Sequence, residues 1–471
     1  MNSEIVFPDG FVWGAATSSY QIEGAAAEDG RTASIWDTFC RMPGRVLNGD
    51  TGDVACDHYH RMEEDLDLMA GLGLKSYRFS TAWPRIVPNS SGAVEQRGLD
   101  FYSRLVDGLL VRGIEPMVTL YHWDLPQSLQ DVGGWANRET ANRFAEYAAV
   151  VGTALGDRVS TFLTLNEPWC SAFLGYATGV HAPGLTDRSM AFTAAHHLNL
   201  AHGQAVTALR SVLPGGAQVG VTLNLSQVEP DDPDSPADLA ASEHVVDIAN
   251  RIFTEPMLRG RYPDRLFEQT RHLTDWSFVA DGDLAAIASP IDVLGINYYQ
   301  PARIKAPHGD TNLWPGTDLA ASAEQVGPYT AMGWSIIPDG LTKLLVSVHQ
   351  DYPEIPLMIT ENGCAFNDVA NVDGEVHDPN RVSFLRGHLA AVHTAIVAGA
   401  DVRGYYVWSL MDNFEWAVGY SARFGIVHVD FGNQRRTLKD SARWYRDVAA
   451  ANALPEESEP QPEPRVAASL D

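Results

Sequence analysis

The stretch that decides the fold is Pro356-Leu357-Met358-Ile359-Thr360-Glu361-Asn362-Gly363, an apolar run that ends in a carboxylate and a glycine. This pattern predicts a short buried strand and a turn directly after it. The same pattern occurs in Thr161-Phe162-Leu163-Thr164-Leu165-Asn166-Glu167-Pro168, where the proline ends the strand. In a barrel of parallel strands, such strand ends face the rim where substrates bind. Either glutamate alone could be a solvated loop residue, but their joint occurrence predicts a carboxylate pair.

Apolar runs of strand length alternate with helical patterns along the whole chain. Strands are expected at residues 11–18, 75–83, 115–124, 161–167, 218–225, 292–299, 357–361 and 402–410. Helices are expected at residues 60–72, 99–112, 139–155, 189–212, 236–253, 339–352, 380–398 and 438–449. Eight strands, each followed by a helix, predict an α/β fold that consists of a single (β/α)8 TIM barrel.

The chain has 471 residues and shows no internal domain boundary, a size that a barrel with long loops reaches as one domain. We expect this domain to cover residues 1–453. The longest stretches between elements, roughly 30–57, 301–338 and 412–436, all follow strand ends, so we expect Trp-rich binding loops at the C-terminal face of the strands. Residues 454–471 are acidic and rich in Pro and Glu, and we expect a disordered tail without a catalytic role.

The charge of the chain excludes several classes of partner. It carries 60 acidic residues against 33 Lys and Arg, a net charge of −27. Nucleic acid requires clustered positive charge, so we expect no such partner, and an anionic membrane surface is disfavoured for the same reason.

The first eight residues show no basic region followed by an apolar core, and no 18 apolar residues run together. We expect a soluble, cytoplasmic protein with its four separated cysteines reduced, and the pattern predicts no particular oligomeric state.

Polar and aromatic residues gather at the expected strand ends. They are Gln21, Arg78, His122, Trp123, Asn166, Glu167, Asn224, Asn297, Tyr299, Glu361, Trp408, Glu415 and Trp416. Amide, imidazole and carboxylate groups can hydrogen-bond several hydroxyls at once, and indole faces stack on the C–H face of a pyranose. This set predicts a sugar-binding site.

The carboxylate pair suits the cleavage of a glycosidic bond. That reaction requires a proton for the leaving oxygen and a nucleophile or activated water for the anomeric carbon, so two carboxyl groups in different environments suffice without a metal or another cofactor. Arg78 is expected to hold one carboxylate ionised, with Tyr299 donating a hydrogen bond to the same oxygen. The other carboxyl lies near that negative charge, so we expect it to shift toward its protonated form.

Three other interpretations were weighed. The segment Cys56-Asp57-His58-Tyr59-His60 contains metal-ligating residue types, but it lies before a helix and far from the strand-end set, so a packed and capped helix start is favoured. A Schiff-base aldolase needs a lysine at the far end of a strand, but the chain has only Lys75, Lys305, Lys343 and Lys439, and Lys75 opens its strand. A non-catalytic sugar-binding barrel predicts that one carboxylate is missing, and both are present.

The two glutamate segments, in the forms Thr164-Leu165-Asn166-Glu167-Pro168 and Ile359-Thr360-Glu361-Asn362-Gly363, resemble the paired signature of glycoside hydrolase family 1, the β-glucosidases and β-galactosidases. The resemblance extends from Phe7 to about Ala450. Further matching segments are residues 11–24, 122–126, 297–299 and 408–416.

The resemblance implies a retaining mechanism, with Glu167 as acid/base and Glu361 as nucleophile, and with carboxyl groups about 5 to 5.5 Å apart. Arg78 and Tyr299, with Asn297, would support Glu361. Substrate-binding residues would be Gln21, His122, Trp123, Asn166, Trp408, Glu415, Trp416 and Phe424. The leaving-group side would involve Trp169, His181, Asn224 and Trp334. A cis peptide bond between Trp408 and Ser409 is also implied.

The implied substrate is a terminal β-D-glucosyl residue of an oligosaccharide such as cellobiose or of an aryl or alkyl β-glucoside, with β-galactosides and β-fucosides left open. Phosphoglycosidases of the family replace the Glu-Trp pair and add a lysine, whereas this chain keeps Glu415-Trp416 and has no lysine between Lys343 and Lys439. An unphosphorylated sugar is therefore expected. Ser335 stands where many relatives carry an acidic residue, and Cys170 occupies a variable position, so the preferred leaving group stays open.

Overall fold

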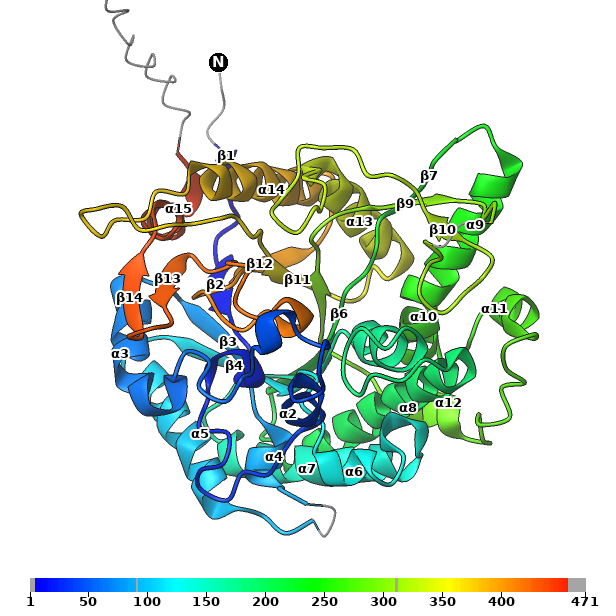
Figure 1. Ribbon diagram of the computed structural model, residues 1–471, viewed down its shortest axis with the longest axis horizontal. Coiled ribbons are helices and arrows are strands. Elements are labelled where there is room, and N and C mark those ends of the chain that lie inside the picture. Colours follow the sequence, from blue (N-terminus) through cyan, green and yellow to red (C-terminus); the bar gives the residue numbers. More distant parts are fainter. Residues whose placement is uncertain (1–4, 90–91, 310–311, 456–471) are drawn as a thin grey trace, which may run out of the picture.

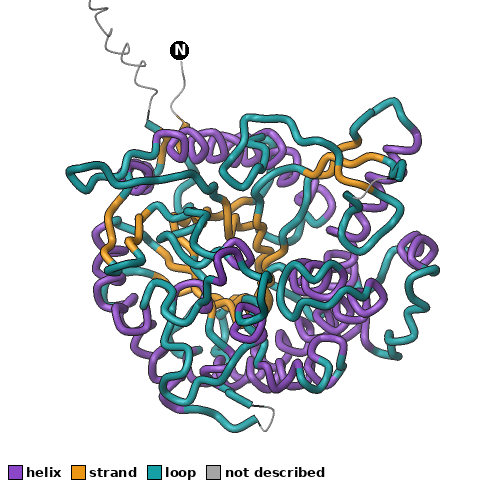
Figure 2. Tube along the Cα trace, in the orientation of Figure 1, coloured by secondary structure: helices purple, strands orange, loops and turns teal. Residues whose placement is uncertain are grey.

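The computed structural model describes residues 5–89, 92–309 and 312–455. Eight parallel strands close into a central barrel, and helices surround it (Figures 1 and 2). The strands are β2 Val12–Ala16, β3 Ser76–Ser80, β4 Glu115–Tyr121, β5 Thr161–Asn166, β6 Gln218–Leu223, β8 Val293–Asn297, β11 Leu357–Asn362 and β12 Val402–Trp408. Each pairs with the next along the chain, and β12 pairs with β2 to close the ring. The predicted (β/α)8 barrel is confirmed.

Helices follow each barrel strand. They are α3 His58–Gly71, α5 Gln96–Leu110, α7 Glu139–Leu155, α8 Arg188–Val212, α9 Pro236–Val246 with α10 Ile252–Arg259, α13 Pro338–Asp351, α14 Pro379–Val397 and α15 Asp440–Ala451. In α5 the buried side chains Leu99, Tyr102, Leu105 and Leu109 recur every three or four residues, so one face packs on the barrel. The apolar periodicity of the sequence predicted these helices because packing against the strands requires that stripe.

Two local expectations are corrected. The helix expected at 236–253 is longer, because a π-helical turn, η4 Asp247–Arg251, joins α9 to α10. The start of α3 was expected to be capped, and that expectation is wrong. Asp57 has a φ of 54°, and its side chain accepts no hydrogen bond from the backbone N–H groups of the first turn. His58 instead contacts Asp65 through Nδ1 (2.7 Å), and Arg436 contacts the same carboxylate. These residues form a buried ion-pair cluster at the helix start.

Shorter elements lie in the connections. The helical ones are α1 Ser19–Ile22, α2 Ile35–Cys40, η1 Leu47–Gly49, α4 Trp83–Ile86, α6 Gln127–Gln130, η2 Gly134–Ala136, η3 Cys170–Ala177, α11 Asp264–Thr270, α12 Asp283–Ile287 and η5 Trp416–Val418. The small sheets pair β1 Ile5–Val6 with β15 Ala453–Leu454, β13 Val427–Asp430 with β14 Arg435–Leu438, and β9 Ala302–Lys305 with both β7 Val228–Pro230 and β10 Ala321–Ser322. Because β15 pairs with β1, Leu454 belongs to the barrel domain, and residues 456–471 of the expected tail lie outside the described residues.

Close packing fixes the segment that follows the strand bearing Glu361. Gly363 lies so near β12 that a Cβ atom there would overlap the carbonyl of Trp408. A side chain at this position would therefore push β11 and β12 apart at the rim. Gly363 is therefore needed for the close approach of the segment after β11 to Trp408, and not only for the turn after its strand.

A buried ion network supports the segment after Trp408. Lys439 Nζ contacts Asp368 (2.5 Å) and Asp412 (2.8 Å). The side chains of all three residues are almost completely buried. Arg381 joins the network through Asp368 (2.7 Å) and Arg423 joins through Asp412 (2.7 Å). Paired buried charges are costly to break, because each leaves its partner uncompensated. The network therefore fixes the backbone that carries the rim residues 408–416.

None of the described helices is both long and apolar enough to cross a membrane.

Candidate active site

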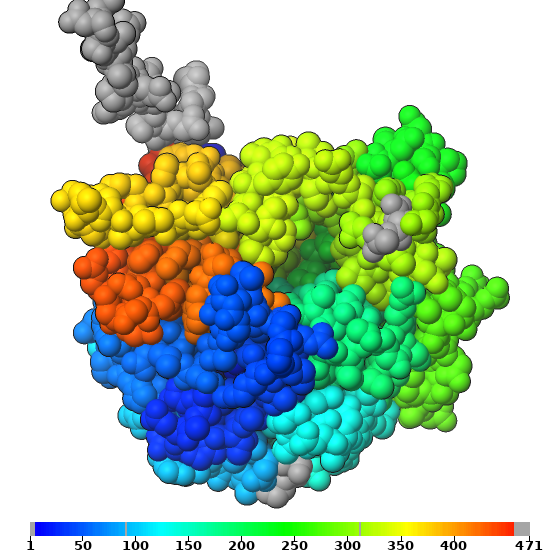
Figure 3. Space-filling view, viewed as in Figure 1, coloured from blue at the N-terminus to red at the C-terminus, as the bar shows by residue number. Residues whose placement is uncertain are grey.

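A cavity of about 360 Å³ opens at the carboxyl ends of the barrel strands. Its mouth is the hollow near the middle of the face shown in Figure 3. Its walls are formed by His122, Trp123, Glu167, Trp169, Cys170, Leu174, His181, Asn224, Leu225, Ser226, Asn297, Tyr299, Gln300, Trp314, Met332, Trp334, Glu361, Trp408, Glu415, Trp416, Ala417, Val418 and Phe424. Aromatic faces with a few converging polar groups are typical of a small-molecule site.

Glu361, at the end of β11, is held through both of its oxygens. Arg78 on β3 donates from Nη1 to Oε1 (2.7 Å), and the Tyr299 hydroxyl donates to Oε2 (2.7 Å). The sequence predicted these partners, but they bind different oxygens rather than the same one. Burial raises the pKa of Glu361, while the Arg78 charge and the Tyr299 hydrogen bond oppose that rise.

Glu167, directly after β5, has a different environment. Asn297 Nδ2 donates to its Oε1 (2.7 Å), and the Cys170 thiol donates to its Oε2 (3.2 Å). Burial, followed by the negative charge of Glu361, raises the pKa of Glu167 to about 7. Glu167 has a φ of 47°, a left-handed conformation that non-glycine residues seldom adopt. Such strain is maintained by surrounding contacts and concentrates at functional sites.

An amide network joins the two carboxyl groups from behind. Asn166 Oδ1 accepts from Arg78 Nη2 (2.6 Å) and from Asn297 Nδ2 (3.1 Å). The Asn297 Oδ1 atom accepts from Thr360 (2.8 Å). Both amide orientations are therefore fixed, since each oxygen receives a donor. A displacement of Arg78 would change the contacts of Glu361 directly and those of Glu167 through Asn166 and Asn297.

His122 is a neutral imidazole with a free donor. Asn166 Nδ2 donates to its Nε2 (3.0 Å), which places the proton on Nδ1. Burial and the Arg78 charge hold the pKa of His122 well below its ordinary value. Within the described part of the chain, Nδ1 has no partner. A buried donor on the cavity wall without a partner suits a ligand hydroxyl.

Glu415 is a third carboxyl group on the cavity wall. Gln21 Nε2 donates to its Oε2 (3.3 Å) while also donating to Asn413 and to the Phe414 carbonyl. Burial, then the charges of Glu361 and Glu167, raise the pKa of Glu415 to about 8. Three buried carboxyl groups thus line one cavity, and Arg78 forms its ion pair with Glu361 alone, so the three cannot all be ionised cheaply at neutral pH.

Aromatic rings form the remaining wall. His122 stacks on Trp408 and on Trp416, with centroids 5.8 and 5.9 Å apart. A cis peptide bond joins Trp408 to Ser409, as the family resemblance implied. A second group of lining rings forms where Trp334 packs against Tyr299 and Phe424. Trp416 and Trp123 also have positive φ angles, of 49° and 80°. Flat faces thus border the cavity on two sides of the carboxyl pair.

Comparison with known proteins agrees with this geometry. The model of glycosyl hydrolase family 1 matches residues 3–454. The chain belongs to glycosyl hydrolase family 1. It is 53% identical to a bifunctional β-D-glucosidase/β-D-fucosidase from Bifidobacterium breve, over 95% of this chain and 98% of that protein. The structure of a psychrophilic β-glucosidase from Micrococcus antarcticus matches with a TM-score of 0.91 and 47% identity, covering 95% and 98% of the two chains. A Thermotoga maritima family 1 β-glucosidase also matches, with a TM-score of 0.91 and 46% identity over 96% of this chain and all of that one.

In this family 1 protein, the residues predicted from sequence lie in the cavity wall or directly behind it. Fourteen line the cavity, namely His122, Trp123, Glu167, Trp169, His181, Asn224, Asn297, Tyr299, Trp334, Glu361, Trp408, Glu415, Trp416 and Phe424. Arg78, Asn166 and Gln21 lie behind the wall, and each is hydrogen-bonded to a lining residue. The structure therefore brings the whole predicted set together. His181 contacts Trp36 and Trp123 through its ring, which places it at the edge of the aromatic wall.

Sequence reasoning missed two features of this family 1 site. Trp314 lines the cavity and packs its ring against Trp169, with centroids 5.7 Å apart. It lies in the long connection between β9 and β10, where no strand end marked it, although that loop was expected to supply a Trp-rich ligand face. The second feature is the thiol contact from Cys170 to Glu167. Spacing gave no signal for it, because the sequence predicted no helix between residues 167 and 189, whereas the structure has η3 at Cys170–Ala177 directly after Glu167.

The segment 56–60 and the lysines are placed away from this chemistry. The Cys56 thiol donates to the Asp412 carbonyl (3.1 Å), and His60 is on the surface. Lys439 is buried in the ion network described above, and none of the four lysines, all in the described part of the chain, lines the cavity. The geometry therefore favours carboxyl-based chemistry over a Schiff base.

Proposed function

We propose that this family 1 protein is a retaining β-glucosidase in which Glu361 is the nucleophile and Glu167 the acid/base. The observation that carries the proposal is the unequal environment of the two buried carboxyl groups. Glu361 receives Arg78 and Tyr299, which favour its ionised form, whereas Glu167 faces amide and thiol donors and the Glu361 charge. A nucleophile must be ionised and a general acid must be protonated, so the two roles follow from the two environments.

The proposed reaction has two steps. In the first, the Glu361 carboxylate attacks the anomeric carbon from the α face while Glu167 gives its proton to the leaving oxygen. The glycosidic bond breaks, the aglycone departs as an alcohol, and a covalent α-glucosyl ester remains. In the second step, ionised Glu167 removes a proton from water, the water oxygen attacks the anomeric carbon, and the Glu361 carboxylate is released. Two inversions give β-glucose with retained configuration.

The sugar-binding part of the proposal rests on the aromatic and polar walls. Trp408 would lie beneath the glucosyl ring, and His122, Trp123, Asn166, Gln21, Glu415 and Trp416 would hold its hydroxyls, with Phe424 at its outer edge. The orphaned Nδ1–H of His122 and the fixed amides support this arrangement. A phosphorylated sugar is disfavoured because three carboxyl groups, Glu167, Glu361 and Glu415, line the cavity and none of the four lysines of the chain, all in its described part, does. The substrate is therefore an unphosphorylated terminal β-glucosyl residue.

The leaving-group side is proposed to involve Trp169, His181, Asn224 and Trp334. Trp314 extends this set, because it continues the wall formed by Trp169. Cellobiose and aryl or alkyl β-glucosides are the proposed substrates, which makes a role in the breakdown of cellulose-derived oligosaccharides part of the proposal. β-Fucosides are included because the relative from Bifidobacterium breve is named for both activities. A cytoplasmic location is also proposed, since all four cysteines are buried free thiols, a state suited to a reducing compartment.

Proton NMR of the reaction tests the mechanism. The purified enzyme is mixed with a p-nitrophenyl β-glucoside, and the anomeric signal of the first-formed glucose is followed before mutarotation. The β anomer is expected first, and an initial α anomer would show inversion. A 2-deoxy-2-fluoro glucoside with a good leaving group should then label Glu361, identified by peptide mass spectrometry. A label on Glu167 would overturn the assignment of roles.

A further inference from the structure

The two oxygens of Glu167 have different partners, and this difference determines where its proton can lie. Asn297 Nδ2 donates to Oε1 (2.7 Å). The Asn297 atom that faces Oε1 is Nδ2, which can only donate, while its Oδ1 accepts from Thr360 (2.8 Å). Oε1 is therefore the oxygen that accepts from the protein. This geometry favours Oε2 as the site of the proton in the neutral carboxyl.

The protein partner of Oε2 is the thiol of Cys170. Its Sγ lies 3.2 Å from Oε2, and Asn224 Nδ2 lies 3.6 Å from the same sulfur. A thiol can donate to an ionised carboxylate, and it can accept weakly from a protonated carboxyl. Burial and the adjacent Glu167 charge raise the pKa of Cys170 well above its ordinary value, so the thiol keeps its proton. Cys170 can thus serve both protonation states of Glu167.

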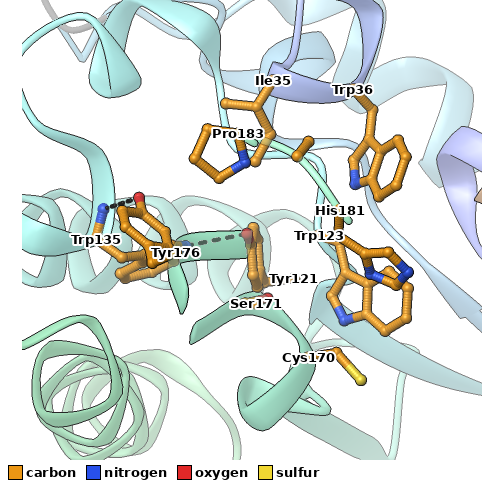
Figure 4. Close-up of a pocket in the computed structure, with 11 residues that line it drawn as sticks. Ile35, Trp36, Tyr121, Trp123, Trp135, Cys170, Ser171, Tyr176, His181 and Pro183 are labelled. Carbon is orange, nitrogen blue, oxygen red and sulfur yellow. Dashed lines mark hydrogen bonds between the residues drawn. The ribbon is translucent and has the colours of Figure 1, made fainter. Parts of the chain in front are cut away.

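The backbone fixes this contact. The Cys170 N–H donates to the Glu167 carbonyl (3.0 Å), and the π-helix η3 begins at Cys170. Behind the cysteine is a separate space of only about 10 Å³, bordered by Tyr121 and Ser171. Figure 4 shows the Cys170 sulfur pointing away from these two residues. The small space leaves room for about one water, so the thiol cannot readily turn toward Tyr121 and Ser171, and it stays on the side of the active-site cavity that holds Glu167.

We propose that Cys170 is a positioning residue that orients Oε2 of Glu167 toward the leaving-group oxygen and, through Asn224, couples the leaving-group side of the cavity to the acid/base proton. This inference rests on the proposed role of Glu167 as acid/base. The S–H donor stabilises the ionised form, so it holds the pKa of Glu167 lower than burial alone would set it. Asn224 donates to the sulfur and polarises the S–H bond, which strengthens the donation to Oε2.

The test is the pH dependence of kcat/KM in Cys170 variants. Cys170→Ala and Cys170→Val remove the donor, so the alkaline limb should move to higher pH by about half a unit. Cys170→Ser keeps a hydroxyl donor on the same carbon and should restore most of the parental profile. The acid limb should stay in place in all three variants, because the partners of Glu361 are Arg78 and Tyr299. If Cys170 had only a structural role, its variants would change activity or melting temperature. They would not shift the alkaline limb of kcat/KM while leaving the acid limb in place.

Asn224 provides the second arm of the test. Asn224→Ala should move the alkaline limb in the same direction by a smaller amount, but only while the thiol is present. In the Cys170→Ala background the further shift should vanish, since the two residues act through one contact. Additive shifts would overturn the coupling. Cys364→Ala is the matched control, because Cys364 is equally buried and makes no contact with Glu167. Its profile should match the parent.

Failure of this inference can be separated from failure of the proposed function. If Glu167→Gln removes the alkaline limb while Cys170→Ala and Cys170→Val leave the limb of the parent unmoved, Glu167 is the acid/base and Cys170 does not position its proton. If Glu167→Gln keeps the limb, the acid/base assignment itself is wrong. A downward shift in Cys170→Ala would also overturn the inference, because it would mean that the thiol favours the protonated carboxyl.

Discussion

Arg78 contacts Glu361 directly and is linked to Glu167 through Asn166 and Asn297, all from a single guanidinium. Its Nη1 donates to Glu361 Oε1 (2.7 Å), and its Nη2 donates to Asn166 (2.6 Å), which in turn accepts from the Asn297 amide that binds Glu167. The planar fork of arginine makes this division possible, and a lysine ammonium could not reproduce it. One buried cation therefore sets the charge of Glu361 and the geometry of Glu167.

Replacement of Arg78 should act mainly on the acid limb of activity. Arg78→Lys keeps a positive charge but loses the fork, so the ionised form of Glu361 is less stabilised and its pKa rises further. We expect the acid limb of kcat/KM to move to higher pH and the maximum to fall about 10- to 100-fold. Stopped or continuous assays with an aryl glucoside over a range of pH values measure both the position of the acid limb and the maximum of kcat/KM. An unmoved acid limb would show that another group controls it.

The alkaline limb should belong to Glu167. In the free enzyme kcat/KM requires this carboxyl to be protonated, so activity should fall as pH rises through its pKa of about 7. Glu167→Gln should remove that limb and lower turnover of unactivated glucosides about 10²- to 10⁴-fold. Substrates with very acidic leaving groups should lose much less, because they need little protonation. Persistence of the limb in the variant would assign it to another group.

Glu415 should make stability fall with rising pH. Its pKa in the folded protein is about 8 against an ordinary value of 4.5, so the folded state binds more protons than the unfolded state between these values. The free energy of unfolding must then decrease as pH rises through this window. Glu415→Gln lacks this loss, so its stability relative to the parent should be greater at pH 8 than near pH 4.5, by up to about 4 kcal/mol.

Thermal unfolding of both proteins at the two pH values measures the effect. Glu354→Gln is the matched control, because it makes the same substitution at an exposed position outside the cavity. Equal behaviour of the Glu415 and Glu354 variants would show that Glu415 is not held in its neutral form. Loss of sugar binding should accompany the gain in stability, because Glu415 lines the cavity.

Trp314 should select for flat leaving groups. Its ring extends the face of Trp169, so an aryl aglycone can stack where a methyl group cannot. Trp314→Ala should lower kcat/KM for a phenyl β-glucoside about 3- to 10-fold more than for methyl β-glucoside. Trp314→Phe should retain most of the preference. Equal losses for both substrates would show that Trp314 supports the cavity wall without contacting the aglycone.

The barrel and most of its rim could be predicted from sequence because strand-length apolar runs end in functional residues. Glu361 and Asn297 lie at the carboxyl ends of β11 and β8, Glu167 directly follows β5, and the barrel topology brings these parallel strand ends together. Trp314 could not be found this way, since its loop has no periodicity and its position depends on the small sheet of β9 and β10. The sequence also gives no sign of the positive φ of Glu167, a conformation usually associated with glycine.

The different roles of the two glutamates should be visible in the stereochemistry of azide rescue. Glu167→Ala removes the proton donor but keeps the nucleophile, so a dinitrophenyl β-glucoside, whose leaving group needs little protonation, should still form the covalent intermediate. Azide needs no general base and should attack this intermediate to give the β-azide. Glu361→Ala opens space on the opposite face of the ring, and azide should displace the leaving group once to give the α-azide.

Without azide, both variants should turn over unactivated glucosides several orders of magnitude more slowly, because each lacks a group that acts in the transition state. The anomeric coupling constant of each glucosyl azide identifies the product. Double replacement of Glu167 and Glu361 is the control, and it should give the α-azide, since one displacement then remains possible and no covalent ester can form. An α-azide from Glu167→Ala alone would contradict the assignment, because it would mean that the intact Glu361 had not attacked the sugar before azide did.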